Sequence, residues 1–187
     1  MVIHRDAVEL RDARALRAYA HPVRMRLIGL LRQEGPMTAT QLGERLSESS
    51  GSTSYHLRQL ARFGLVEEAG GGKGREKPWR ATALFTHLPD TETSAEMAEA
   101  SIDLRLALAR RWHEVVLDWI VRRPGEPKRW QRAAPFSDYG IYVTAAELVE
   151  LDRQIDNLMR PYITSRDKDH RPRGSRHVTY VTYGVPR

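Results

Sequence analysis

The clearest fold signal in this sequence lies in residues 49–83, SSGSTSYHLRQLARFGLVEEAGGGKGREKPWRATA. It starts with small hydroxyl side chains and continues as a helical pattern over residues 50–63. At about 100° per residue, Thr53, Leu57, Leu60 and Ala61 fall on one side, which we expect to pack inward. The opposite side carries side chains that are small or able to form hydrogen bonds: Ser52, Tyr55, Gln59 and Arg62. The pattern predicts a helix whose outer face touches a polar partner.

A hairpin follows this helix. Gly64 predicts the end of the helix, residues 65–68 and 77–82 predict two strands, and the glycines of residues 70–74 predict a flexible tip between them. Trp79 is the expected packing residue of the returning strand. The tip is basic, so the hairpin predicts a contact with an anionic surface.

Three further helices are predicted before residue 49. Apolar spacing indicates helices over residues 7–19 and from His21-Pro22 to Gly35, with Pro at the tolerated first position. Thr38 and Gln41 have the spacing of a capping box, which predicts a short helix up to Leu46. Two short helices joined by a turn and followed by a hairpin indicate a winged helix-turn-helix domain.

This arrangement predicts recognition of double-stranded DNA, because the major groove is wide enough for one helix. Small side chains at the start of residues 50–63 allow a close approach to phosphates, and larger ones can reach bases. The wing can lie in or beside the minor groove. The predicted DNA-binding residues are Ser50, Ser52, Thr53, Ser54, Tyr55, His56, Arg58, Gln59, Arg62, Lys73, Arg75 and Lys77.

The charge distribution agrees with a polyanionic partner. The formal net charge of the 187 residues is +6. Residues 1–88 contain 14 Lys and Arg against 9 Asp and Glu, a net +5, whereas residues 89–187 contain 16 against 15, a net +1. The excess therefore belongs to the half that contains the predicted DNA-binding domain.

With these residues in view, the chain resembles the ArsR-type winged-helix transcriptional regulators over about residues 15–85. The most specific pieces are STSYHLRQL in residues 52–60 and GLV in residues 64–66. The resemblance implies a homodimer that binds operator DNA, usually as a repressor released by a small-molecule effector. The Cys-containing metal motif of metal-sensing members is replaced by QLGER in residues 41–45, so we expect no metal and no cofactor.

The carboxy-terminal half predicts a dimerisation unit. Apolar residues at helical spacing over residues 94–121 indicate a helix of roughly 42 Å, too long to bury its stripe alone. The residues predicted to form the dimer interface are Leu10, Leu16, Ile102, Leu106, Ala109 and Val116. Residues 136–143 and 177–183 predict strands around a helix at residues 144–159. The expected fold class is mainly α with small β, divided into a DNA-binding domain at residues 1–89 and a dimerisation and effector domain at residues 90–187.

Aromatic residues in that half have two interpretations. Trp112, Trp119, Trp130 and Tyr139 could line an effector pocket, although aromatic residues at helical spacing are more often core or dimer contacts. The other open question is the class of function. An architectural DNA-binding protein and a protein-interaction module remain the alternatives to a sequence-specific regulator.

The sequence disfavours enzymes, membrane proteins and secreted proteins. No phosphate-binding loop, zinc-binding His pair or nucleophile elbow is present, so we do not expect an enzyme. The chain has no Cys, and no apolar run approaches the roughly 18 residues of a membrane span. The charged start at residues 1–14 is unlike a secretory signal, which predicts a cytoplasmic protein without a membrane partner.

Overall fold

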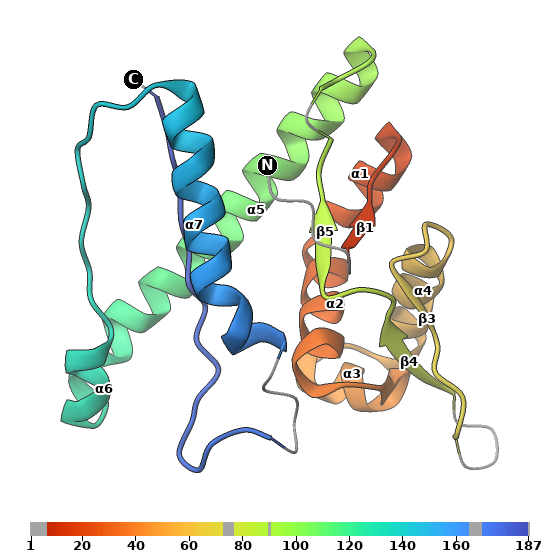
Figure 1. Cartoon of the computed structure of the whole chain (residues 1–187). Helices are drawn as coiled ribbons and strands as arrows, with labels where there is room; N and C mark the ends of the chain where they lie inside the picture. The colour runs from red at the N-terminus through yellow and green to blue at the C-terminus, as the bar shows by residue number, and fades with distance from the viewer. Residues whose placement is uncertain (1–6, 73–76, 90, 165–169, 187) are drawn as a thin grey trace.

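The computed structural model describes residues 7–72, 77–89, 91–164 and 170–186 (Figure 1). The amino-terminal part contains the strands β1 (Ala7–Glu9), β2 (Met37–Thr38), β3 (Val66–Glu68), β4 (Pro78–Ala81) and β5 (Phe85–His87). Its helices are α1 (Ala13–Tyr19), α2 (Pro22–Glu34), α3 (Ala39–Leu46) and α4 (Ser50–Ala61). The long helix α5 (Ala95–Arg122) leads through a 3-10 turn (Arg123–Gly125) to α6 (Lys128–Ala133) and α7 (Ala145–Thr164).

The wing is a three-stranded antiparallel sheet in the order β2-β4-β3. Trp79 on β4 stands opposite Met37 on one side and Glu68 on the other. Together with α3 and α4, this sheet forms the predicted winged helix-turn-helix domain.

The predicted helix at residues 7–19 is wrong in its first part. Ala7–Glu9 form β1, which pairs in parallel with β5, and the Leu10 amide donates a hydrogen bond to the His87 carbonyl at 3.1 Å. Asp12 then caps α1 by accepting a hydrogen bond from the Ala15 amide at 2.8 Å. The cap fixes the start of the helix, and the residues before it take part in a sheet.

One hydrophobic core connects the amino-terminal helices to the start of α5. It contains Leu16 from α1, Leu27 from α2 and Leu57 from α4, all fully buried, together with Ala100 and Leu104 from α5. Arg17 adds an ion pair across the α1–α5 contact, 2.7 Å from Glu96. Residues on both sides of the expected boundary between residues 89 and 90 therefore share one core.

The carboxy-terminal unit differs from the expected strand-helix-strand arrangement. Its helix α7 has the predicted start, because Thr144 and Glu147 bond reciprocally as a capping box, with Oγ1 of Thr144 3.2 Å from the Glu147 amide. Residues 136–143 and 177–183 are not strands in the described part of the chain. Their alternating sequence suits a sheet, but a strand also requires a neighbouring strand, and neither segment has one.

Candidate nucleic-acid interface

The turn between α3 and α4 sets the orientation of α4. Ser47 lies in the left-handed region with φ of 57°, and the Glu48 amide donates a hydrogen bond to the Gly43 carbonyl at 2.9 Å. A Cβ added at Gly43 would lie 2.7 Å from the Glu48 carbonyl oxygen. The turn backbone therefore lies so close to α3 that a side chain at residue 43 requires the turn to shift.

Hydroxyl groups hold the start of α4. Ser49 is the N-cap and accepts a hydrogen bond from the Ser52 amide at 3.1 Å. Thr53 is fully buried and its Oγ1 donates to the Ser49 carbonyl at 3.0 Å. Thr53 is therefore part of the structural support of α4, which corrects its prediction as a DNA-binding residue. Ser52 is half-buried and its hydroxyl donates to Glu48 Oε2 at 3.1 Å.

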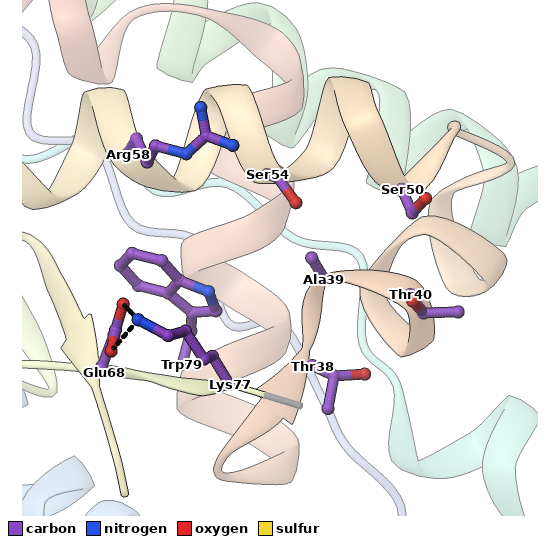
Figure 2. Close-up of a pocket in the computed structure, with 9 residues that line it drawn as sticks. All are labelled: Thr38, Ala39, Thr40, Ser50, Ser54, Arg58, Glu68, Lys77 and Trp79. Carbon is purple, nitrogen blue, oxygen red and sulfur yellow. Dashed lines mark hydrogen bonds and ion pairs between the residues drawn. The ribbon is translucent and has the colours of Figure 1, made fainter. Parts of the chain in front are cut away.

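A groove of about 720 Å³ runs between α4, the start of α3 and the wing. Figure 2 shows the side chains that these three segments place around it. The groove is lined by Thr38, Ala39, Thr40, Ser50, Ser54, Arg58, Glu68, Lys77 and Trp79. Of the predicted DNA-binding residues, the groove therefore brings together Ser50, Ser54, Arg58 and Lys77.

Both charges and hydrogen-bond donors reach the groove. The first turn of α3 has backbone N–H groups with no partner inside the helix, and the helix dipole makes that end positive. Lys77 Nζ donates to both carboxylate oxygens of Glu68, at 3.0 and 3.1 Å (Figure 2). The positive charge of Lys77 is thus paired with an acidic side chain inside the groove, while Arg58 adds an exposed cation from α4.

Other predicted residues of α4 lie outside the groove. Tyr55 is 54% exposed and Arg62 is also exposed, whereas Gln59 is half-buried. The predicted wing-tip residues Lys73 and Arg75 fall outside the described residues. A surface made of Tyr55, Arg58 and Arg62 therefore borders the groove along the outer side of α4.

His56 faces the interior of the domain instead of the groove. Its ring lies 4.6 Å, centroid to centroid, from His21, whose Nδ1 caps α2 by accepting a hydrogen bond from the Val23 amide. Burial lowers the pKa of both imidazoles, and the positive charge of Arg24 lowers each further. The Nδ1 atom of His56 is buried without a hydrogen-bond partner. The lowered pKa values favour the neutral form of both imidazoles where α4 meets α2.

Sequence reasoning missed several groove residues. The sequence pattern gives Thr38 only as the cap of the short helix and Trp79 only as a packing residue of the wing, and it indicates no site role for Thr40. Their signal was the position of the capping box directly before the helix-turn-helix turn, which places the α3 start beside α4. Glu68 gave no signal, because an acidic side chain is unexpected on a DNA-binding face.

The six residues predicted for the dimer interface divide into two groups. Leu10 and Leu16 are 2% and 0% exposed in the core of the chain itself, so their assignment to an interface is corrected. Ile102 and Leu106 are 58% and 49% exposed, and Ala109 and Val116 are half-buried. The exposed group shares one side of α5, nearly opposite the side that packs in the core.

The four aromatic residues predicted for an effector pocket make separate contacts. Trp112 lies edge-on to Tyr183 at 5.8 Å, Arg122 stacks over Trp119 at 4.9 Å, and Arg176 stacks over Trp130 at 5.0 Å. Tyr139 is 85% exposed. These contacts spread the rings over the carboxy-terminal unit and do not gather them around one cavity.

The described ranges contain neither a metal-binding cluster nor a membrane span. No three His, Asp or Glu side chains lie close enough there to hold a metal ion. No helix in the described part of the chain is long and apolar enough to cross a membrane.

A known family model matches part of the amino-terminal domain. Residues 19–69 match the family model of a helix-turn-helix domain, which spans α2 to β3. This match bears out the expected helix-turn-helix without singling out the ArsR type. No curated protein matches the sequence significantly.

Three solved structures have a limited similarity to this chain. Reduced HlyU from Vibrio cholerae is 22% identical with a TM-score of 0.33, covering 50% of this chain and 84% of its own. NMB1585, a MarR family regulator from Neisseria meningitidis, is 20% identical with a TM-score of 0.33, covering 78% and 79%. The transcriptional regulator Tm0710 from Thermotoga maritima is 11% identical with a TM-score of 0.32, covering 79% and 81%. The fold assignment rests on this chain's own elements and on the family model.

Proposed function

We propose that the chain is a sequence-specific, double-stranded DNA-binding transcriptional regulator that acts as a homodimeric repressor. The observation that carries the proposal is the groove between α3, α4 and the wing. There the hydroxyls of Thr40, Ser50 and Ser54, the positive start of α3 and the guanidinium of Arg58 all face one surface. Hydroxyls, backbone N–H groups and arginines are the groups that bind DNA phosphates and fix a helix in the major groove.

Within this function, α4 enters the major groove with its first turn. Arg58 contacts a phosphate beside it, Lys77 lies across the groove in its pair with Glu68, and Tyr55, Gln59 and Arg62 are the candidates for contact with base edges or flanking phosphates. With α4 in the major groove, the Gln59 amide can form hydrogen bonds with the edge of an adenine base. The wing residues, with Lys73 and Arg75 at its tip, lie against the minor groove or the backbone.

A homodimer supplies the second α4 needed for a palindromic site. Two recognition helices bind half-sites about 34 Å apart on successive helical turns, which requires a fixed spacing. Ile102 and Leu106 on α5 are exposed apolar side chains that a second copy can cover. The residues before about residue 90 then recognise DNA, and the residues after it form the subunit contact. The protein works in the cytoplasm and catalyses no reaction.

The experiment is fluorescence anisotropy with a labelled duplex from the gene's own upstream region and a scrambled duplex, each at two salt concentrations. Salt-sensitive binding that is at least a thousandfold tighter to one duplex supports a sequence-specific regulator. Equal affinity for both duplexes favours an architectural protein. No binding to either favours a protein-interaction module and refutes the proposal.

The dimer is tested separately with Ile102→Glu and Leu106→Glu. Charges placed on a buried apolar seam are expected to give monomers with poor DNA affinity, as measured by light scattering and anisotropy. A dimer that persists in the double variant contradicts the assignment of α5 to the interface.

A further inference from the structure

The chain exposes more surface than a compact monomer of its mass. Its accessible surface is 13573 Å², whereas a compact 21.4 kDa monomer exposes about 9,100 Å². The excess of about 4,400 Å² is larger than the roughly 1,000–2,500 Å² that each copy contributes to an obligate homodimer. Part of the excess is apolar and lies in the carboxy-terminal unit, where residues 136–143 and 177–183 carry large side chains that are more than half exposed: Phe136, Tyr139, Ile141, Tyr142, Val178, Tyr180 and Tyr183.

These side chains lie on two extended segments with unpaired backbones. Among the described residues, residues 136–143 and 177–183 take part in no backbone-to-backbone hydrogen bond. In Figure 1 both segments are drawn as coil, and neither belongs to the two sheets of the described residues. Each segment therefore presents free N–H and C=O groups beside exposed aromatic and β-branched side chains, a template for strand addition.

The sequence of these edges favours pairing with a copy of themselves. Natural edge strands avoid self-association with charged residues, especially Lys, or with Pro. Residues 177–183, HVTYVTY, contain none of these, and residues 136–143 contain only Asp138. The segment after α7 is also held in place, because Arg176 is 2.6 Å from Glu126 and Tyr183 packs on Trp112.

We propose that residues 136–143 and 177–183 pair as strands with the same two segments of a second copy, so that the carboxy-terminal unit is part of the subunit interface. In a dimer with a two-fold axis, both copies present the same two segments to each other, so each segment has a pairing partner in the other copy. The inference rests on the proposed homodimer and names a surface for it in addition to the exposed side of α5.

Hydrogen–deuterium exchange on the full-length chain tests the pairing. In the dimer, amides of residues 136–143 and 177–183 are expected to exchange at least tenfold more slowly than unpaired amides. Exchange at the unprotected rate in a chain that light scattering shows to be dimeric overturns this inference and leaves the homodimer intact. A chain that is monomeric at all concentrations refutes the homodimer itself, while its DNA affinity remains a separate measurement.

A matched pair of variants tests whether the partner is a second copy. Val178→Lys with Tyr180→Lys is expected to raise the dimer dissociation constant at least tenfold in sedimentation equilibrium. Thr91→Lys with Thr93→Lys adds the same charge at the same spacing in an exposed segment and is expected to leave the constant unchanged. An unchanged dissociation constant in the first variant shows that the strands pair within one chain or not at all, and overturns the proposal.

Discussion

Glu68→Gln is expected to strengthen DNA binding and to make it more sensitive to salt. In the described structure both carboxylate oxygens of Glu68 accept hydrogen bonds from Lys77 Nζ, at 3.0 and 3.1 Å, inside the groove. The substitution removes a negative charge that faces the phosphates and frees Lys77 to neutralise one. Each added phosphate contact changes the slope of log K against log salt by about −0.9, so a dimer gains about −1.8. Over a fourfold rise in salt, the variant should lose about twelvefold more affinity than the parent chain.

The measurement is anisotropy at 50, 100 and 200 mM salt. The matched control is Glu67→Gln, which removes the same charge from the neighbouring residue of β3. Glu67 pairs with Arg80 at 2.7 Å and does not line the groove. A steeper slope in Glu68→Gln alone supports the groove as the phosphate site. An unchanged slope in Glu68→Gln, or the same change in both variants, would refute the reasoning.

Three further predictions concern the framework behind the groove. Gly43→Ala should lower the free energy of unfolding by about 1–3 kcal/mol, because its Cβ meets the Glu48 carbonyl at 2.7 Å. Gly51→Ala, at an exposed position of α4, should not lower it. Equal losses of the two variants in urea unfolding would contradict this. Burial lowers the pKa of His21 and His56, so the folded chain binds fewer protons than the unfolded chain and its stability should fall as the pH drops below about 6.5. Urea unfolding at pH 7.5 and 5.5 should show a smaller decline in a His21→Asn, His56→Gln variant, and an undiminished decline would exclude the pair as its source. Leu104→Ala should lower the free energy of unfolding by about 2.7–5 kcal/mol, because Leu104 is fully buried. Leu106→Ala, at an exposed position of α5, should weaken the dimer more than the fold. Calorimetry measures the first effect and light scattering the second, on both variants.

The sequence predicted best those features that are determined by neighbouring residues. The capping box of Thr38 and Gln41 is present in both directions, and the long helix expected at residues 94–121 is found as Ala95–Arg122. The hairpin with its glycine tip also has its predicted strands on either side. A cap or a tight turn involves residues within a few positions of each other, so a single sequence contains its whole signal.

Features that depend on distant partners were missed or misassigned. Ala7–Glu9 form a strand only because Phe85–His87 lie beside them, and no pattern within residues 7–19 indicates that pairing. The reverse error occurred at residues 177–183, where alternation predicts a strand and the chain itself supplies no neighbour. Alternation shows that a segment can join a sheet, whereas the presence of a sheet depends on the rest of the fold.

The candidate site was predicted in part for the same reason. The helical pattern identified α4 and its exposed Arg58, yet it also assigned Thr53, which the turn between α3 and α4 buries. Thr40 and Glu68 enter the groove from other elements, so their contribution follows from tertiary packing and not from the pattern of α4. A groove assembled from three segments is visible in sequence only through the segment that carries the motif.

The long helix α5 shows both cases, since its helical pattern was predicted from sequence and its packing was not. Its sequence was interpreted as one apolar stripe including Ile102 and Leu106, but a second set, including Ala100 and Leu104, packs on the opposite side into the core with α1. A helix with two apolar sides needs two partners; among the described residues one side packs into the core at its amino-terminal half, while Ile102 and Leu106 on the other side stay exposed. Because the same α5 segment packs into the core that holds α4, a subunit contact on its other side in the proposed homodimer would fix α4 relative to its copy. In that dimer the packing of α5 sets the spacing of the two DNA half-sites, so a substitution at Leu106, which does not line the groove, should alter DNA affinity through the dimer.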